Sequence, residues 1–268
     1  MSIDPANPAP RSVFIPLRIG LKVAAMVLAS IVMMPTQWLL MRVTRGRASF
    51  VLPRIWFGCM RSVMGLRFEL VGTPRDAGGT LFVGNHISHF DIVLLGSVLR
   101  ARFIAKSEIE HWPAMKFIGE LAQTLYISRR ARDAASVAAS IAAQMRPDHD
   151  LVLFAEGTTS PGERVAPFKS SLFAPFLVEP AAQTWKLQPF TLEIVSFDGR
   201  RLSEGGDRDG YALHGDMDTG VHVKRFLSLS GALVRITFHP PIDIRPGMDR
   251  KALALQVHDI VESSLPLR

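Results

Sequence analysis

From about residue 67 onward, short apolar runs rich in β-branched and aromatic residues alternate with longer stretches of helical pattern. The apolar runs predict seven strands, at 67–72, 80–84, 102–105, 124–128, 151–155, 187–197 and 232–239. The helical patterns predict helices at about 90–100, 111–122, 133–146, 169–179 and 249–264. This alternation predicts an α/β fold with a mixed, largely parallel sheet of about seven strands flanked by helices. The polar, Gly- and Asp-rich segment 199–222 predicts a long loop.

The N-terminal part has a different pattern. Residues 23–41 (VAAMVLASIVMMPTQWLLM) carry no charge and are close to the length that crosses a bilayer core. Basic residues lie on both sides of this run. We therefore expect an N-terminal membrane-associated helical segment at 1–66, followed by a folded domain at 67–268. A helix that spans the membrane and one that lies in a single leaflet both fit this pattern, and a buried core helix is the plain alternative.

The distribution of charge favours lipid over nucleic acid as the partner. The 268-residue chain has a formal net charge of +7. The whole excess lies in residues 1–61, because the remainder holds equal numbers of basic and acidic residues. Basic residues on both sides of an apolar segment are typical of contact with anionic lipids. We therefore expect the protein to bind membrane lipids and not to bind nucleic acid. Cys59 is the only cysteine, which excludes an intrachain disulfide.

The stretch NHISHFD (85–91) interrupts an apolar run with polar residues, and three interpretations compete for it. Ser88 and Asp91 fit a capping box at a helix start, which leaves Asn85 and His86 unexplained. A metal site needs further ligands, and no second cluster accompanies these residues. At a strand-to-helix junction, His86 and Asp91 can also meet as a catalytic pair, in which the carboxylate orients the imidazole as a general base.

A second polar cluster ends another predicted strand. In LVLFAEGTTS (151–160), an apolar run is followed by Glu156, Gly157 and Thr158. Gly157 allows a sharp turn, and amides and hydroxyls there can line a polar or anionic group. An ordinary turn with a capping hydroxyl residue is the alternative.

Together these two clusters resemble the motifs of the glycerolipid (lysophosphatidic-acid) acyltransferase superfamily. NHISHFD resembles the first motif, Asn-His-x₄-Asp, and FAEGTTS resembles the third. AKSEIEHWP (105–113) with TLYISRR (124–130) resembles the second motif, and LQPFTL (187–192) resembles the fourth. The resemblance implies His86 and Asp91 as catalytic residues. It implies a substrate-binding set of Asn85, Arg129, Glu156, Gly157, Thr158 and Pro189.

The run EGTTSPGERVAPFKSSLF (156–173) and the segment YALHGDMD (211–218) are similar to bacterial lyso-ornithine-lipid acyltransferases. The resemblance implies transfer of a fatty acyl group from acyl-acyl-carrier protein (acyl-ACP) or acyl-CoA to the free hydroxyl of a lysolipid. That lysolipid is lyso-ornithine lipid or 1-acyl-sn-glycerol-3-phosphate. The same resemblance implies that the enzyme needs no cofactor. It also implies that the protein lies in the inner membrane with its catalytic domain facing the cytoplasm. A non-catalytic lipid-binding membrane protein is the alternative.

One further group of residues has the side chains of metal ligands. His214, Asp216, Asp218 and His222 lie close together in the sequence, but their spacing matches no metal motif. A polar loop explains the same composition, so we expect no metal. His89 is a second candidate base beside His86, but its neighbours match no motif.

Overall fold

A computed structural model describes residues 14–106, 119–120, 122–127, 134–179, 181–204 and 206–266. Its sheet has nine strands: β1 (Leu66–Val71), β2 (Thr80–Gly84), β3 (Ala101–Lys106), β4 (Leu125–Ile127), β5 (Asp150–Phe154), β6 (Lys186–Phe197), β7 (Arg200–Arg201), β8 (Ala232–Phe238) and β9 (Ile242–Asp243). All seven predicted strands are present. The two additional strands, β7 and β9, have two residues each and pair with β6.

The strand order is β1-β8-β6-β2-β5-β3-β4. Strands β6, β2, β5, β3 and β4 run parallel to one another, whereas β8 is antiparallel to β6 and parallel to β1. This confirms the predicted mixed, largely parallel sheet. Because β2 and β5 are parallel neighbours, their carboxyl ends lie side by side, and both polar clusters follow those ends.

Three predicted helices are confirmed as α3 (Phe90–Val98), α5 (Ala134–Ala142) and α8 (Arg250–Glu262). The range 169–179 contains a 3₁₀ helix, η3 (Ser170–Phe176), and a short helix α6 (Ala181–Thr184) follows it. The prediction at 111–122 lies almost entirely outside the described residues.

The predicted loop at 199–222 is only partly correct. It contains a single-turn 3₁₀ helix, η4 (Leu202–Glu204), and its end belongs to a helix, α7 (Thr219–Ser228). Asp218 is the N-cap of α7, since its side chain accepts the backbone N–H of Val221. Helix α7 was not predicted because many of its residues are polar. It buries only one narrow face, through His222, Phe226 and Leu227.

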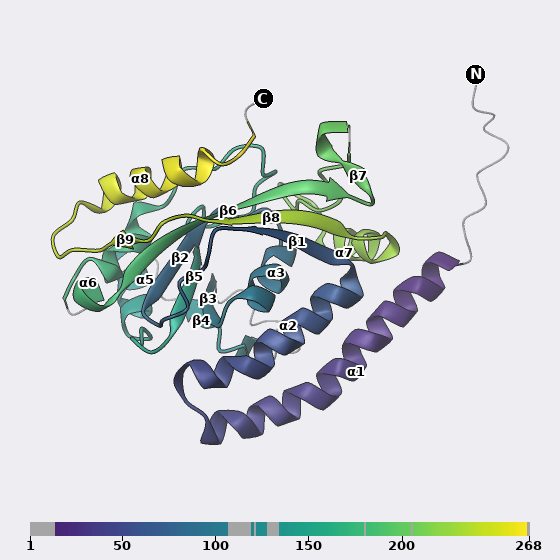
Figure 1. Ribbon diagram of the computed structural model, residues 1–268, viewed down its shortest axis with the longest axis horizontal. Coiled ribbons are helices and arrows are strands. Elements are labelled where there is room, and N and C mark those ends of the chain that lie inside the picture. The colour runs from purple at the N-terminus through teal and green to yellow at the C-terminus, as the bar shows by residue number, and fades with distance from the viewer. Residues whose placement is uncertain are drawn as a thin grey trace.

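Helices cover both faces of the sheet (Figure 1). One core cluster joins a face of the sheet to α2, α3 and α7 through Phe57, Leu94 and Phe226. The other joins the opposite face to α5, η3 and α8, through residues such as Phe173 and Val257. The polar segments at the ends of β2 and β5 are therefore set in a rigid, doubly covered sheet.

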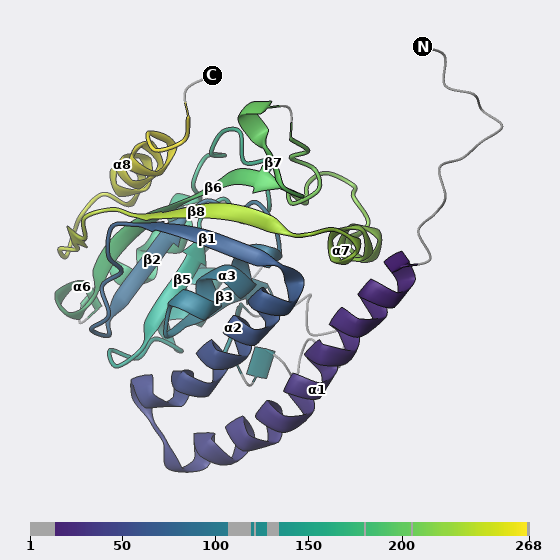
Figure 2. The same ribbon diagram turned by 45° about the vertical axis from the view of Figure 1, so that its right-hand side comes forward.

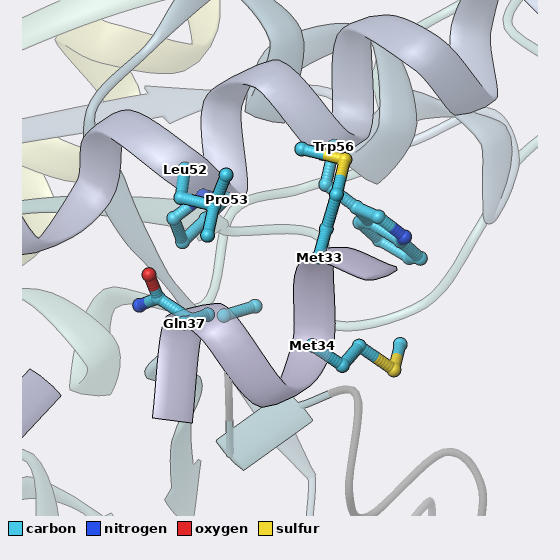
Figure 3. A pocket seen from close by; sticks show the side chains of 7 residues that line it. Met33, Met34, Gln37, Leu52, Pro53 and Trp56 are labelled. Atoms are coloured by element: carbon cyan, nitrogen blue, oxygen red, sulfur yellow. The ribbon is translucent and has the colours of Figure 1, made fainter. Parts of the chain in front are cut away.

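The N-terminal segment forms a helical hairpin along one side of the molecule. Helix α1 (Phe14–Val43) turns through η1 (Gly46–Phe50) into α2 (Val51–Met64), and the two helices run antiparallel (Figures 1 and 2). By length and composition α1 could cross a membrane, and its most apolar window is not buried by the rest of the protein. Figure 3 shows a pocket between α1 and α2 that includes none of the motif residues; its lining is Met33, Met34, Gln37, Leu52, Pro53, Trp56 and Ala122.

Helix α2 also belongs to the core of the folded domain. Its residues Phe57 and Met64 are buried in the cluster that contains α3 and β8. At its C-terminus Gly65 has φ +81°, and a Cβ there would lie 2.2 Å from the carbonyl oxygen of Ser230. The boundary between 66 and 67 stays a prediction, but the two parts share one core.

Candidate active site

The loop between β2 and α3 is organised around Asp91. This residue lies in the first turn of α3 and is fully buried, and its Oδ2 accepts the backbone N–H groups of Ile87 and Ser88 at 2.7 and 2.9 Å. The bond from Ser88 is one half of the predicted capping box. The other half is absent from the described structure, because Ser88 Oγ has no hydrogen-bond partner there.

The same carboxylate contacts His86. Asp91 Oδ2 lies 2.8 Å from His86 Nδ1, and because a carboxylate only accepts, Nδ1 carries the proton. The ring of His86 stacks on Phe154 with centroids 3.8 Å apart, which fixes its plane. Nε2 has no partner among the described residues, and the side chain is 16% exposed. The loop thus presents a basic nitrogen to the surface, as the catalytic interpretation requires.

The second cluster is bonded to the first through Glu156. Its Oε1 accepts the backbone N–H of His86 at 2.7 Å, and its Oε2 accepts the N–H of Ala166 at 3.0 Å. The N–H of Ser160 in turn donates to the carbonyl of His86 at 2.8 Å. Burial raises the pKa of the Glu156 carboxyl, although these hydrogen bonds oppose the shift. Both backbone groups of His86 are therefore held by the segment after β5.

Asn85 attaches the same loop to β6. It is fully buried, its Nδ2 donates to the carbonyl of Leu192 at 2.9 Å, and its Oδ1 accepts the N–H of Leu192 at 2.8 Å. In this structure Asn85 and Glu156 thus position His86, since their polar atoms are used within the chain. Their predicted contact with substrate stays a prediction.

Gly157 and Thr158 lie at the surface beside this junction. Gly157 has φ +72°, a conformation that favours glycine, and a Cβ there would come within 2.6 Å of Lys169 Nζ. Thr158 is exposed and makes no hydrogen bond to the described residues. The ammonium of Lys169 has no carboxylate partner within the described part of the chain. These three residues are therefore available to a ligand.

The two remaining predicted binding residues are placed differently. Pro189 is buried in β6, where it is paired with Val83 of β2, so it lies inside the sheet. Arg129 lies outside the described residues.

The structure also shows what the suspected metal ligands do. Asp218 caps α7, His214 Nε2 lies 3.1 Å from Asp209 Oδ1, and His222 is buried beside Phe90. Among the residues the structure describes, no group of three or more His, Cys, Asp or Glu side chains is arranged to hold a metal ion.

His89 has a different environment from His86. Neither of its ring nitrogens has a hydrogen-bond partner in the described structure, and its ring meets the edge of His222 at 5.4 Å between centroids. Burial, aided by His222, lowers the pKa of His89 from 6.5 to about 4. A neutral ring packed in this way is a structural element and a poor competitor for the role of base.

Tyr211 is the site residue that sequence reasoning did not identify. Its side chain is fully buried, and its hydroxyl donates to Asp91 Oδ1 at 2.7 Å. The only signal was its position in YALHGDMD, a segment noted for its likeness and given no chemical role.

The chain is also similar to several known proteins. A family model described as Acyltransferase matches residues 67–179. A lyso-ornithine lipid O-acyltransferase from Brucella abortus is 32% identical over 93% of this chain and 94% of its own. Another from Rhodobacter capsulatus is 32% identical over 77% of this chain and 73% of its own. The crystal structure of a 1-acyl-sn-glycerophosphate acyltransferase from Thermotoga maritima shares the fold, with a TM-score of 0.61 and 17% identity over 94% of this chain and 96% of that chain.

The family model and these relatives show that the chain is an acyltransferase. More particularly, the chain belongs to the acyltransferase family of which these lyso-ornithine lipid enzymes are members.

Proposed function

We propose that this enzyme transfers a fatty acyl group from acyl-ACP or acyl-CoA to the free hydroxyl of a lysolipid, with lyso-ornithine lipid as its principal acceptor. The observation that carries the proposal is the His86–Asp91 pair, which has the proton on Nδ1 and a free Nε2. The names of the two relatives at 32% identity support the acceptor. The name of the structural neighbour keeps 1-acyl-sn-glycerol-3-phosphate as the second candidate.

The proposed reaction is a single displacement. His86 Nε2 takes the proton of the lysolipid hydroxyl while the oxygen attacks the thioester carbonyl and forms the new C–O bond. Collapse of the tetrahedral intermediate breaks the C–S bond, and the imidazolium returns the proton to the leaving thiolate. Asp91 stabilises the imidazolium throughout. No protein nucleophile or cofactor enters this scheme.

Lys169 and Thr158 are proposed to bind the acceptor beside the base. The lysine ammonium lies over Gly157 and has no carboxylate partner in the described structure. An ornithine headgroup offers a carboxylate and a glycerophosphate offers a phosphate, so one ammonium serves either acceptor. Arg129 is proposed as a second headgroup contact on the basis of its motif.

We further propose that the hairpin lies in one leaflet of the inner membrane, with the site facing the cytoplasm, where acyl thioesters are made. Lys22 of α1 donates to the carbonyls of Met64 and Leu229, at the ends of α2 and α7. Helix α1 therefore runs along the folded domain (Figure 2). A span perpendicular to the membrane would carry those polar helix ends into hydrocarbon. A protease added outside intact cells should leave the chain uncut; cleavage would contradict this orientation.

The test of function is acyl transfer by membranes that carry the wild type, His86→Ala or His258→Ala. Labelled acyl-ACP and acyl-CoA are offered separately, each with lyso-ornithine lipid and with 1-acyl-sn-glycerol-3-phosphate. We expect ornithine-lipid product from wild type and from His258→Ala, whose histidine lies on α8, and none from His86→Ala. Product that persists in His86→Ala would refute the base. A preference for the phosphate acceptor would refute the acceptor alone.

A further inference from the structure

A buried phenol lies against the side of Asp91 that faces away from His86. Asp91 Oδ2 is already shared by His86 Nδ1 and two backbone N–H groups, whereas Oδ1 accepts one bond, from the Tyr211 hydroxyl at 2.7 Å. Asp91 is fully buried, so without this hydroxyl Oδ1 would lack any partner within the described chain. A buried carboxylate oxygen with no donor is strongly unfavourable.

Tyr211 is itself held in place by the β2–α3 loop and by α7. The N–H of Leu213, two residues later, donates to the carbonyl of Ile87 at 3.0 Å. The Tyr211 ring packs against Phe90 and Phe226, with centroids 5.9 and 6.3 Å away. The segment that contains Tyr211 is thus bonded to the catalytic loop at two points, the side chain of Asp91 and the backbone of Ile87.

The phenol keeps its proton at any working pH. Burial, together with the charge of Asp91, raises the pKa of Tyr211 well above 10. Tyr211 is therefore a permanent donor to Asp91 and takes no part in proton transfer.

We propose, on the basis of the function given above, that Tyr211 is a positioning residue for the catalytic pair. Its hydroxyl fixes rotation of the Asp91 carboxylate so that Oδ2 stays directed at His86 Nδ1. It also withdraws part of the negative charge that would otherwise act on the imidazolium. The plain alternative is that Tyr211 only fills the core, and in that case its oxygen has no effect on the base.

Tyr211→Phe separates the two readings because it keeps the ring and removes the oxygen. We expect kcat to fall about tenfold, the equivalent of one charge-assisted hydrogen bond, with the KM for the acceptor unchanged. The acid limb of the pH–rate profile should move to higher pH, because a carboxylate with one donor fewer holds the proton of His86 more strongly. The other titratable groups near this pair are His89, His222 and Glu156, and all three remain in the variant.

A second readout does not depend on turnover. The ring resonances of His86, in histidine-labelled protein in detergent micelles, should titrate at higher pH in Tyr211→Phe than in wild type. In an Asp91→Asn background the same substitution should cause no shift, because the effect passes through the carboxylate. If a folded Tyr211→Phe variant has the same kcat and the same His86 titration as the wild type, Tyr211 is only a core residue.

The two proposals fail separately. A wild type without acyl transfer but with the expected shift in the His86 titration would overturn the function and keep the role of Tyr211. If Tyr211→Phe does not fold, fluorotyrosine in the wild type gives the answer, because the chain has only two tyrosines. One fluorine signal should then respond when His86 titrates, and silence of both signals would overturn the proposal.

Discussion

Because the ring of His89 is buried and neutral, we predict that the free energy of unfolding decreases by a defined amount at acidic pH. The pKa of His89 is lowered to about 4, against 6.5 for a free histidine, chiefly by burial. The unfolded chain therefore binds a proton at a pH where the native protein does not. The contribution of the neutral ring is complete above about pH 6.5 and is lost as the pH falls from 6.5 to 4. At about 1.4 kcal/mol per pKa unit, the full loss is about 3 kcal/mol.

The perturbation that isolates this effect is His89→Phe, which keeps an aromatic ring against Phe90 and removes both nitrogens. Its matched control is His258→Gln, which removes the partly exposed histidine of α8. Equilibrium unfolding in non-ionic detergent micelles, followed by tryptophan fluorescence, gives the free energy of unfolding at pH 7, 6, 5 and 4. The pH dependence is compared between variants, because His89→Phe also changes packing at neutral pH.

We expect the wild type and His258→Gln to lose stability steeply below pH 6.5, and His89→Phe to lose about 3 kcal/mol less. Part of the acid loss should persist in His89→Phe, since burial also lowers the pKa of His222. An identical pH dependence in the wild type and His89→Phe would show that the ring of His89 is protonated or solvated in the native protein. The assignment of His89 as a structural residue would then be wrong.

Three further changes test how the loop and the hairpin are held. Asn85→Ala removes the side chain that bonds both the N–H and the carbonyl of Leu192. It should lower the free energy of unfolding, measured by chemical denaturation, by about 2–4 kcal/mol. Gly157→Ala places a Cβ against Lys169 in a left-handed conformation, and it should raise the KM for the acceptor several-fold and cost about 1 kcal/mol in unfolding; an unchanged KM would contradict a ligand contact there. Lys22→Met should speed proteolysis of the hairpin in micelles, with Arg18→Met as the control, and equal rates would contradict its attachment to the domain.

Much of the fold could be predicted because its strands are apolar, short and separated by long helical segments. The seven predicted strands, β1 to β6 and β8, begin and end within two residues of their predicted limits, and the two polar clusters follow adjacent parallel strands. Helix α7 was missed because charged and polar residues outnumber its buried ones, so that the pattern resembled a loop.

The contact between His86 and Asp91 could be predicted because the two residues are five positions apart, and local chain reversal brings them together. The contact between Tyr211 and Asp91 could not, because 120 residues separate them. Local sequence also cannot show where a polar side chain points. Asn85 and Glu156 carry the residue types of ligand contacts, yet the fold directs both at the backbone of neighbouring segments.

Because α1 has an uncovered apolar side, the acceptor concentration that matters for this enzyme is the one within the membrane. Large hydrophobic residues such as Leu21, Leu28 and Ile31 are about two-thirds exposed along its length. A protein held in lipid by that surface meets a lysolipid by lateral diffusion within the leaflet, while its soluble thioester arrives from the aqueous side. The velocity should then follow the mole fraction of acceptor in the bilayer. Adding inert phospholipid at a fixed total amount of acceptor would slow the reaction by surface dilution alone.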